Sequence, residues 1–397
     1  MTDPKTPQTA LVHSEYRAPE GFQACPPPIL RASTVLFENV AAMRARASRW
    51  LDKSTYSYGL FGTPTTYELE ARLAELEGGE NCLLTPSGLA AAAMVDLALL
   101  NPGDDLLLPE NVYSPAGDLG QWLEAKLGIT ARTYDPMAGA AIAGLIRSNT
   151  RLVWAEAPGS VSMEVPDVPA LCRAAHARGV PVALDNTWSA GIAFRGFDHG
   201  ADLVLQALTK YQSGGSDLLM GAVITRDREL YRKLGMAHLH LGYGVGVEDA
   251  YLVLRSLPTL RMRFAAHDAG ARKVASWLKQ RPEISRVLHP ACPDCPGHET
   301  WKRDFTGAGG LFSVVFDERY PEAQTDRCID SLKYFRIGFS WGGSASLVLP
   351  YRIQGMRSAW PGSGQLVRFN IGLEDPDDLI ADLAQALAVL QDGASVS

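Results

Sequence analysis

Apolar and polar residues alternate along this chain in short blocks that are typical of strands and helices following one another. Helical spacing of apolar residues begins at Thr65, stops at Gly78-Gly79, and recurs over 168–177. Since strands that alternate with helices usually form a parallel sheet covered on both faces, the pattern predicts an α/β domain. The runs that are typical of buried strands lie at 82–84, 105–109, 129–134, 151–155, 180–184, 201–207 and 218–224.

The pattern changes at about residue 256, where a long helix that begins near Glu248 leads out of this domain. A helical stretch over 264–278, strand patterns over 310–316 and 367–372, and an amphipathic helix over 374–390 predict a smaller α+β domain. The first 62 residues show little periodicity and contain many Pro and Gly, which indicates an arm lying against another surface. We therefore divide the chain into an arm (1–62), a large domain (63–255) and a C-terminal domain (256–397).

Length and charge describe an ordinary soluble globular protein. The chain has 397 residues and a net charge of -7, and it contains no run of Lys and Arg of the kind that binds nucleic acid. No apolar run reaches the ~18 residues of a membrane span, and the N-terminus lacks the apolar segment of a signal peptide. We expect a cytoplasmic protein that binds neither nucleic acid nor a membrane.

The cysteines do not form the dense framework of a small secreted domain, so we expect free thiols. A cluster at His289, Cys292, Cys295 and His298 offers four potential metal ligands at intervals of three. Three prolines and a glycine within this segment indicate a surface loop, and structural zinc sites rarely crowd all ligands so closely. We predict no metal here. The six cysteines are Cys25, Cys82, Cys172, Cys292, Cys295 and Cys328.

A lysine and an aspartate each follow an apolar strand at the point where it gives way to polar residues. Lys210 comes after the run that begins at Leu203 and precedes a Ser-Gly-rich loop, and Asp185 ends the run that begins at Val180. A lysine at a strand end can simply extend to the surface. If the two strands are parallel neighbours, however, both side chains reach the carboxyl edge of the sheet, where α/β proteins bind ligands. A Lys and an Asp in one pocket are what pyridoxal phosphate (PLP) chemistry requires, the Lys to bind the cofactor and the Asp to keep its ring nitrogen protonated.

Two further positions admit both a structural and a functional interpretation. At Ser87-Gly88 a short strand turns into an alanine-rich helix, so the free amides and helix dipole can bind an anion, or Ser87 can serve only as a helix cap. Arg368 lies inside an apolar strand, where it needs a carboxylate partner, either from the protein or from a substrate. Beside a cofactor-binding lysine, the substrate carboxylate is favoured.

Several segments, in this order and spacing, resemble the Cys/Met-metabolism PLP enzymes of fold type I, and within that group most closely the bacterial cystathionine β-lyases. The resemblance covers nearly the whole chain after the first fifty residues. It implies a large, mostly parallel seven-stranded sheet and a smaller α+β C-terminal domain. The segments are Leu76-Glu-Gly-Gly, Asp185-Asn-Thr-Trp, Thr209-Lys210-Tyr, Phe339-Ser-Trp341-Gly-Gly and Arg368-Phe-Asn-Ile-Gly-Leu-Glu-Asp.

The resemblance also implies roles for individual residues. Lys210 would bind PLP covalently and act as acid and base, Asp185 would pair with the ring nitrogen, and Tyr113 would stack on the ring. Tyr58 would reach the phosphate from the neighbouring subunit, within a homotetramer of dimers that share their active sites. The backbone of Gly88 and Leu89 and the hydroxyl of Thr209 would bind the phosphate, and Ser340, Trp341 and Arg368 would bind the substrate carboxylate. The catalytic set so implied is Lys210, Tyr113 and Tyr58.

The chain departs from the family pattern just after Tyr58. The family usually has an arginine two residues further on, and the lyase branch often has a second one beside it, but this chain has Leu60 and Phe61. The first change removes a cation from the cofactor phosphate, and the second makes the distal end of the substrate pocket more apolar. Asp118 keeps a carboxylate near the mouth of the pocket. Cystathionine and smaller or more apolar cysteine S-conjugates are therefore both candidate substrates.

The resulting hypothesis is an α,β-elimination that converts L-cystathionine or a related cysteine thioether to a thiol, pyruvate and ammonia. One alternative keeps the cofactor and changes the reaction to γ-elimination or γ-replacement, as in methionine γ-lyase, cystathionine γ-synthase or the sulfhydrylases. The other alternative is a non-catalytic relative that acts as a binding or regulatory protein.

Overall fold

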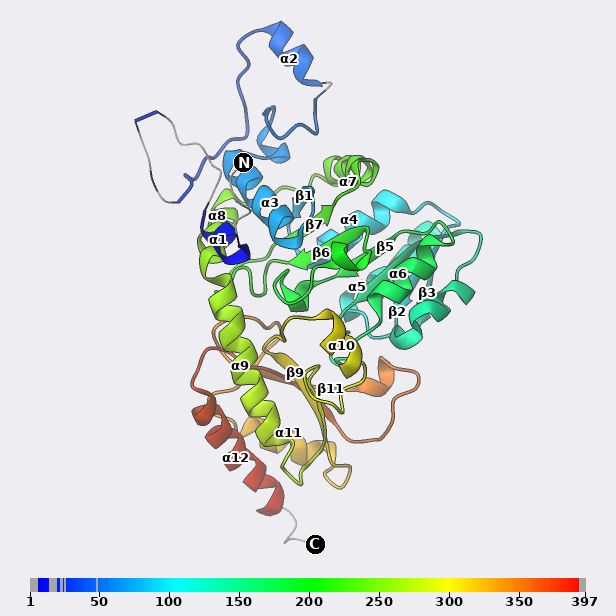
Figure 1. Cartoon of the computed structure of the whole chain (residues 1–397), viewed down its shortest axis with the longest axis vertical. Helices are drawn as coiled ribbons and strands as arrows, with labels where there is room; N and C mark the ends of the chain where they lie inside the picture. The colour runs from blue at the N-terminus through cyan, green and yellow to red at the C-terminus, as the bar shows by residue number, and fades with distance from the viewer. Residues whose placement is uncertain (1–5, 14–19, 22–23, 25, 48, 393–397) are drawn as a thin grey trace.

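A computed structural model describes residues 6–13, 20–21, 24, 26–47 and 49–392 of the chain (Figure 1). Two β-sheets form the centres of two domains that follow one another in sequence. In Figure 1 the larger domain, cyan to green, lies above the smaller one, which is yellow to red. The helix α9 (Leu260–Leu278) runs down from one to the other.

The larger sheet has seven strands in the order β1-β7-β6-β5-β4-β2-β3. The neighbouring pairs from β6 to β3 are all parallel, whereas β7 runs antiparallel to both β1 and β6. The predicted fold class, a mostly parallel seven-stranded sheet with a smaller second domain, is confirmed. The strands are β1 (Asn81–Thr85), β2 (Asp105–Pro109), β3 (Thr130–Tyr134), β4 (Thr150–Glu156), β5 (Val182–Asp185), β6 (Leu203–Ala207) and β7 (Gly221–Thr225).

Helices cover both faces of this sheet because successive strand residues point to opposite sides. Leu83 of β1 packs with Met94 and Leu234 under α4 and α7, while Leu84 packs with Leu73 and Leu171 of α3 and α6. The helices of this domain are α3 (Pro64–Glu77), α4 (Gly88–Leu99), α5 (Ser114–Leu127), α6 (Val168–His176), α7 (Arg228–Leu241) and α8 (Val247–Ser256). Short 3-10 turns occur at Thr187–Ser189, Gly196–His199 and Leu257–Thr259, and a longer 3-10 segment with a kink at Gly139 spans Pro136–Gly144.

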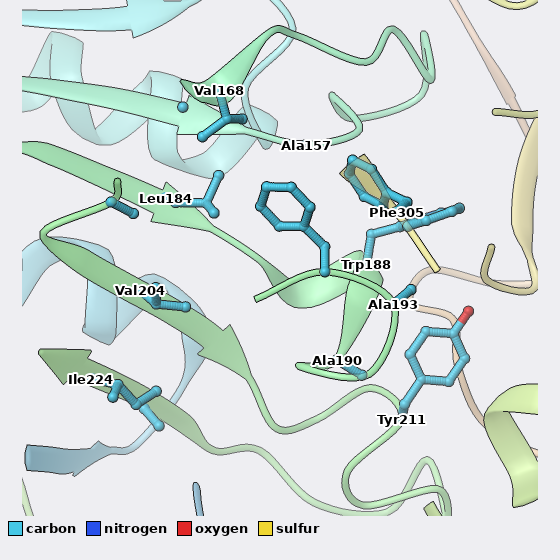
Figure 2. Close-up of a cluster of buried hydrophobic side chains, with 14 of the residues drawn as sticks. Ala157, Val168, Leu184, Trp188, Ala190, Ala193, Val204, Tyr211, Ile224 and Phe305 are labelled. Carbon is cyan, nitrogen blue, oxygen red and sulfur yellow. The ribbon is translucent and has the colours of Figure 1, made fainter. Parts of the chain in front are cut away.

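Figure 2 shows part of the core on the α6 side of the sheet. Leu184, Val204 and Ile224 are register partners on three adjacent strands and therefore lie in one row. Trp188 and Phe305 lie to one side of this row and contact each other edge to face, with ring centres 6.2 Å apart. Leu184, Trp188 and Phe305 belong to one buried cluster that contains residues of both domains. Because burying a large apolar side chain contributes about 1.5–3 kcal/mol, this cluster holds the two domains against each other.

The smaller domain is built on a five-stranded sheet in the order β10-β11-β12-β9-β8, whose pairs are antiparallel except β10 with β11. Helices α9 and α12 supply the apolar side chains that pack on Phe312 and Phe369 of this sheet. The strands are β8 (Ile284–Leu288), β9 (Leu311–Phe316), β10 (Arg336–Ile337), β11 (Leu347–Tyr351) and β12 (Leu366–Asn370). The other elements are α10 (His298–Asp304), α11 (Glu322–Asp330), a 3-10 turn at Ile353–Gly355 and α12 (Pro376–Asp392).

The N-terminal segment contributes the short helices α1 (Pro7–Val12) and α2 (Val40–Ala47) and a 3-10 turn at Gly59–Phe61. In Figure 1 the part that carries α2 extends above the larger domain. Leu36 and Val40 in this part are 88% and 58% exposed, so the chain itself provides no core for them. Within the described part of the chain, no helix combines the length and the hydropathy needed to cross a bilayer.

Candidate active site

Asp185 and Lys210 lie at the carboxyl edge of the large sheet. Asp185 is the last residue of β5, and Lys210 lies in the turn that follows β6. The two strands are parallel neighbours, with Asp185 opposite Leu205. The predicted strand pairing is thus present, and each carboxyl end delivers one ionisable side chain to the same edge.

The ε-amino group of Lys210 is held by residues of the smaller domain. Its Nζ donates a hydrogen bond to Ser340 Oγ at 2.9 Å and lies 5.3 Å from the centre of the Trp341 ring. Burial and the nearby Arg368 guanidinium lower the pKa of Lys210 to about 8, against the opposing effect of Asp185. The unprotonated amine, the form that acts as nucleophile and base, is therefore far more populated near neutral pH than in an ordinary lysine.

Asp185 is a buried carboxyl group that accepts a hydrogen bond from the Thr187 backbone N–H at 3.0 Å. Burial raises its pKa, while the Thr187 bonds and Lys210 oppose that rise. A buried carboxylate gains stability from a cationic partner, so this position favours a ligand that brings a protonated nitrogen.

Tyr113 stands at the start of α5, just past β2, with its side chain 44% exposed. Its backbone N–H donates to Glu156 Oε2 at 2.7 Å, and Glu156 in turn is the last residue of β4, in register with Asp185. Burial and the Asp185 carboxylate raise the pKa of the Tyr113 hydroxyl. Glu156 is absent from the predicted site, although it ends a strand in the same way as Asp185 does.

The N-terminus of α4 lies beside the turn that carries Lys210. Ser87 caps the helix by accepting from the Ala90 N–H at 3.0 Å, which leaves the N–H groups of Gly88 and Leu89 free for an anion. A side chain at Gly88 would collide with Ala207, since a Cβ there would lie 2.8 Å from the Ala207 Cβ. Glycine therefore allows the helix end to reach the end of β6, and the Ser87 cap leaves the first amides of α4 available to an anion.

The hydroxyl of Thr209 is engaged with the backbone of Met220. Thr209 Oγ1 accepts from the Met220 N–H at 3.2 Å and lies 3.4 Å from the Met220 carbonyl oxygen. A phosphate contact by this hydroxyl would require exchange of one of these bonds, so the predicted role of Thr209 stays a prediction.

Arg368 projects from β12 toward the Lys210 turn. Its Nη2 donates to the Ser340 carbonyl oxygen at 3.3 Å, and its guanidinium lies 5.1 Å from the centre of the Tyr351 ring. Burial lowers the pKa of Arg368. Among the described residues, no ion-pair partner of Arg368 was found, so a bound carboxylate would complete its pairing.

Three predicted residues are not drawn into this cluster. Tyr58 pairs its backbone with Thr34 in the N-terminal segment and is 49% exposed, and Phe61 follows it in the 3-10 turn. Asp118 lies on the exposed side of α5. The contacts that Tyr58, Phe61 and Asp118 make within one chain do not bring them to Lys210.

The Cys292–Cys295 segment forms a turn, in which the Cys295 N–H donates to the Cys292 carbonyl oxygen at 3.0 Å. Cys295 Sγ bonds to the Met163 carbonyl oxygen at 3.3 Å, and His298 Nδ1 lies 2.8 Å from the Pro290 carbonyl oxygen. The part of the chain that the structure describes contains no group of three or more His, Cys, Asp or Glu arranged to hold a metal ion. The five cysteines in that part are free thiols, and Cys25 lies outside it.

Comparison with known proteins identifies the family. The profile of the family described as Cys/Met metabolism PLP-dependent enzyme matches residues 8–388. The chain belongs to this family. It is therefore an enzyme, and its cofactor is pyridoxal phosphate, which speaks against the alternative of a non-catalytic relative.

Individual members of the Cys/Met metabolism family are similar over almost the full chain. Cystathionine beta-lyase MetC of Escherichia coli K12 is 39% identical over 98% of this chain and 99% of its own length. Cystathionine beta-lyase of Bordetella avium is 42% identical over 91% of each chain. Among solved structures, cystathionine gamma synthase from Xanthomonas oryzae in complex with aminoacrylate and cysteine has a TM-score of 0.89 at 31% identity, covering 98% of this chain and 99% of that one.

The residues at the sheet edge fit the cofactor of this family. The amine at Lys210 and the carboxyl at Asp185 are the two groups that a pyridine aldehyde requires, and the helix end at Gly88 offers amides to its phosphate. The close approach of Gly88 to Ala207 brings that helix end to the same strand that precedes Lys210. The amine, the carboxyl and the anion site thus lie at one edge.

A second buried network supports the cofactor side of the site. Glu77, at the end of α3, accepts hydrogen bonds from Asn186 Nδ2 at 3.1 Å and from the Gln206 side chain. Burial raises the pKa of Glu77 to about 7, against those two donors. Because Asn186 follows Asp185 directly, this network fixes the backbone next to the carboxyl. The sequence contained a signal for this network, because Glu77, Asn186 and Gln206 are polar residues next to or within apolar strand and helix segments.

Proposed function

We propose that this enzyme is a carbon–sulfur β-lyase that cleaves cysteine thioethers by α,β-elimination, with L-cystathionine or a related S-conjugate as substrate. The observation that carries the proposal is the placement of Lys210 and Asp185 at the ends of adjacent parallel strands, with Arg368 reaching the same turn. The lyase relatives at about 40% identity support the choice of reaction.

The roles of the individual residues follow from their chemistry. When bound, pyridoxal phosphate supplies an aldehyde that joins an amine and a ring that stores the electron pair released at Cα. Asp185 would keep the ring nitrogen protonated, and the Gly88 and Leu89 amides would hold the phosphate. Arg368 would bind the α-carboxylate of the substrate in a bidentate pair.

Lys210 would transfer the proton. Its Nζ, whose pKa is lowered to about 8, would in the unprotonated form remove the hydrogen from Cα. The C–S bond then breaks, and the departing sulfur takes a proton from Lys210 or from a tyrosine, for which Tyr113 and the Tyr58 of a neighbouring subunit are the candidates. Water converts the remaining three-carbon fragment to pyruvate and ammonia.

The Lys210→Ala variant tests this assignment. It should purify without the visible absorbance of covalently bound cofactor and should form no pyruvate from any cysteine thioether. Lys210→Arg is the matched control, because it keeps the charge but not a usable base. Turnover retained by either variant would end the proposal.

A γ-reaction is the second candidate, supported by the close likeness to the Xanthomonas oryzae gamma synthase structure. The two candidates differ in their products. A γ-lyase acting on a homocysteine-derived substrate forms 2-oxobutyrate, whereas the proposed β-lyase forms pyruvate. A panel of L-cystathionine, L-cystine, L-djenkolic acid and S-alkyl cysteines, scored for both oxo acids, separates them.

We also propose that residues 1–62 form an arm that completes the active site of a second subunit, within a homotetramer of dimers. The exposure of Leu36, Val40 and Tyr58 supports this, because each would be covered by a partner. Complementation provides the test. Lys210→Ala and Tyr58→Phe proteins, unfolded together and refolded, should recover activity that neither has alone, because hybrid dimers contain one intact site. Absence of any recovery would contradict a shared site.

A further inference from the structure

The last residue of β4 is a buried glutamate that lies beside Asp185. Glu156 and Asp185 are register partners on the parallel strands β4 and β5, and both are terminal residues of those strands. Neighbouring strands run about 4.8 Å apart, and side chains in register point to the same face of the sheet. The two carboxyl groups therefore occupy adjacent positions at the edge where the cofactor would bind.

Glu156 also anchors the turn that carries Tyr113. Its Oε2 accepts from the Tyr113 N–H at 2.7 Å, and its Oε1 lies 2.5 Å from Ser160 Oγ. Tyr113 occupies the cap position of α5, but its own side chain makes no capping bond, so the Glu156 carboxyl bonds to the backbone there instead. Glu156 is only 9% exposed, and losing it would leave the Tyr113 amide without this acceptor.

The charge balance around this pair is unequal. Burial raises the pKa of Asp185, and the Lys210 amine opposes that rise. The charge that acts most strongly on Glu156 is instead the Asp185 carboxylate, which raises its pKa. Burial and the Asp185 carboxylate raise the pKa of Glu156 to about 8, against the bonds from Ser160 and Tyr113. The Ser160 hydroxyl can donate to an ionised Glu156 or accept from a protonated one, so it fits both states. Lys210 acts on Asp185 and Tyr113 feels both carboxyl groups, while Tyr351 and Arg368 act on Tyr113.

We propose that Glu156 is a positioning residue that holds Tyr113 over the cofactor ring as an uncharged acid and so leaves Asp185 as the carboxylate that pairs with the ring nitrogen. The inference rests on the roles proposed above for Tyr113 and Asp185. A neutral Glu156 still accepts from the Tyr113 amide through one oxygen, while its proton points to Ser160. A second anion beside Asp185 would be repelled at short range in a buried setting, which the neutral form avoids.

Two substitutions distinguish a neutral acid from an anion. In Glu156→Gln the amide oxygen can still accept from Tyr113 and the amide nitrogen can donate to Ser160, which reproduces the bonds of the protonated acid. Glu156→Ala removes both. We expect cofactor-free Glu156→Gln to bind pyridoxal phosphate within about 3-fold of the wild-type Kd at pH 7, and Glu156→Ala to bind it ~10-fold more weakly, because a buried amide loses its acceptor.

The measurements are the cofactor Kd and the circular dichroism of the bound cofactor, which reports how asymmetrically Tyr113 stacks on the ring. Neither depends on which thioether is cleaved, so the outcome is separable from the fate of the proposed lyase reaction. The dichroism of Glu156→Gln should match that of wild type at pH 7, and that of Glu156→Ala should be reduced. Ser160→Ala is the matched control, since it leaves the Tyr113 bond in place and should change the Kd by less than about 3-fold.

The pH dependence provides a further readout that a purely structural role would not alter. In wild type, ionisation of Glu156 at high pH places a second anion beside Asp185 and should alter the dichroism of the bound cofactor, and Glu156→Gln should lack this change. A Glu156→Gln enzyme as impaired as Glu156→Ala would show that the anion is required and would overturn the proposal. Unchanged dichroism and Kd in Glu156→Ala would overturn the positioning role. Should Glu156→Ala fail to fold, the Glu156→Gln and Ser160→Ala comparisons with wild type still decide.

Discussion

The ε-amino group of Lys210 donates a hydrogen bond to the hydroxyl of Ser340, with 2.9 Å between Nζ and Oγ. Lys210 belongs to the larger domain and Ser340 to a turn of the smaller one, so the bond crosses the junction between them. Ser340 holds a left-handed backbone conformation with φ of 80°, which is costly for a residue other than glycine. A strained serine in this place indicates that its hydroxyl has a function.

Removing the Ser340 hydroxyl should slow catalysis while affecting stability in two different ways. We expect Ser340→Ala and Ser340→Gly both to lower kcat by ~10-fold, because the amine of Lys210 loses a partner that orients it. Ser340→Gly should in addition be more stable than Ser340→Ala by about 1 kcal/mol, because glycine adopts φ of 80° without strain. Pyruvate formation and urea unfolding measure the two effects. If Ser340→Gly restored kcat, the strain rather than the hydroxyl would be the cause.

The charge of Arg368 should control the titration of Lys210. Burial and Arg368 lower the pKa of Lys210 to about 8, so replacing the guanidinium by Met removes part of that effect. The amine reacts with the cofactor aldehyde only when unprotonated, so the rate at which cofactor-free enzyme takes up pyridoxal phosphate should rise with pH. In Arg368→Met this rise should occur at higher pH than in wild type. Arg336→Met, on the exposed strand β10, is the control. Identical pH profiles for Arg368→Met and wild type would contradict the coupling.

The placement of Asp185 and Lys210 at one edge of the sheet could be predicted from the sequence because it follows from local patterns and one topological rule. Each residue ends an apolar run, and parallel neighbours bring such ends together. Most strands and helices of the larger domain lie within a few residues of the predicted runs for the same reason. The antiparallel direction of β7 could not be predicted, since the residues of a strand do not encode the direction of its partner.

The contacts that position Tyr113 could not be predicted, because they join segments far apart in the chain. Glu156 binds the Tyr113 amide from another strand, and Arg357 contacts Glu110 across 247 residues of sequence. The short strands β8, β10 and β11 were also missed, since their pairing partners rather than their own composition make them strands. The role of Tyr58 needs a second subunit and stays a prediction.

Arg357 should be one of the largest single contributors to the junction between the domains. It lies in the loop after β11, is 6% exposed, and contacts Glu110, Asp135 and Glu164 of the larger domain. Arg357→Ala would leave the Glu164 carboxylate, also 6% exposed, without its cation, so we expect the free energy of unfolding to fall by about 3–5 kcal/mol.

The control for Arg357 is Arg352, which pairs with Glu322 at 3.1 Å but is 84% exposed. Because solvent screens such a pair, Arg352→Ala should cost about 1 kcal/mol or less. The double variant Arg357→Met, Glu164→Leu should regain much of the loss, since no buried charge then remains uncompensated at that position. Equal losses for Arg357→Ala and Arg352→Ala in urea unfolding would show that burial does not strengthen the Arg357 contacts.

Asp96 should make stability depend on pH. Its carboxyl is 2% exposed and accepts from Trp154 Nε1 at 2.8 Å. Burial raises the pKa of Asp96 to about 7, despite the bond from Trp154. A carboxyl whose pKa is higher in the folded state stabilises the protein at low pH, and this contribution is lost as pH rises from about 4 to about 7. Wild type should therefore lose of order 3 kcal/mol over this window relative to Asp96→Asn, which cannot titrate. Parallel stability curves for the two proteins would show that Asp96 is ionised throughout.

Leu60 and Phe61 allow the two ends of the active site to be tested separately. If the arm reaches a neighbouring subunit, Leu60→Arg returns a cation to the cofactor phosphate and should tighten pyridoxal phosphate binding by ~10-fold, through one charge-assisted hydrogen bond. It should leave the choice of substrate unchanged. Phe61→Arg instead places a cation at the distal end of the pocket, where L-cystathionine carries a carboxylate and an S-alkyl cysteine does not.

Phe61→Arg should therefore raise kcat/KM for L-cystathionine relative to S-ethyl cysteine by ~10-fold, with little change in cofactor affinity. Each variant serves as the control for the other, because one property should change where the other does not. The decisive measurement is the ratio of the two kcat/KM values together with the cofactor Kd for both variants. If Phe61→Arg changed neither quantity, residue 61 would lie outside the substrate pocket, and the apolar turn at Gly59–Phe61 would have no part in selecting the thioether.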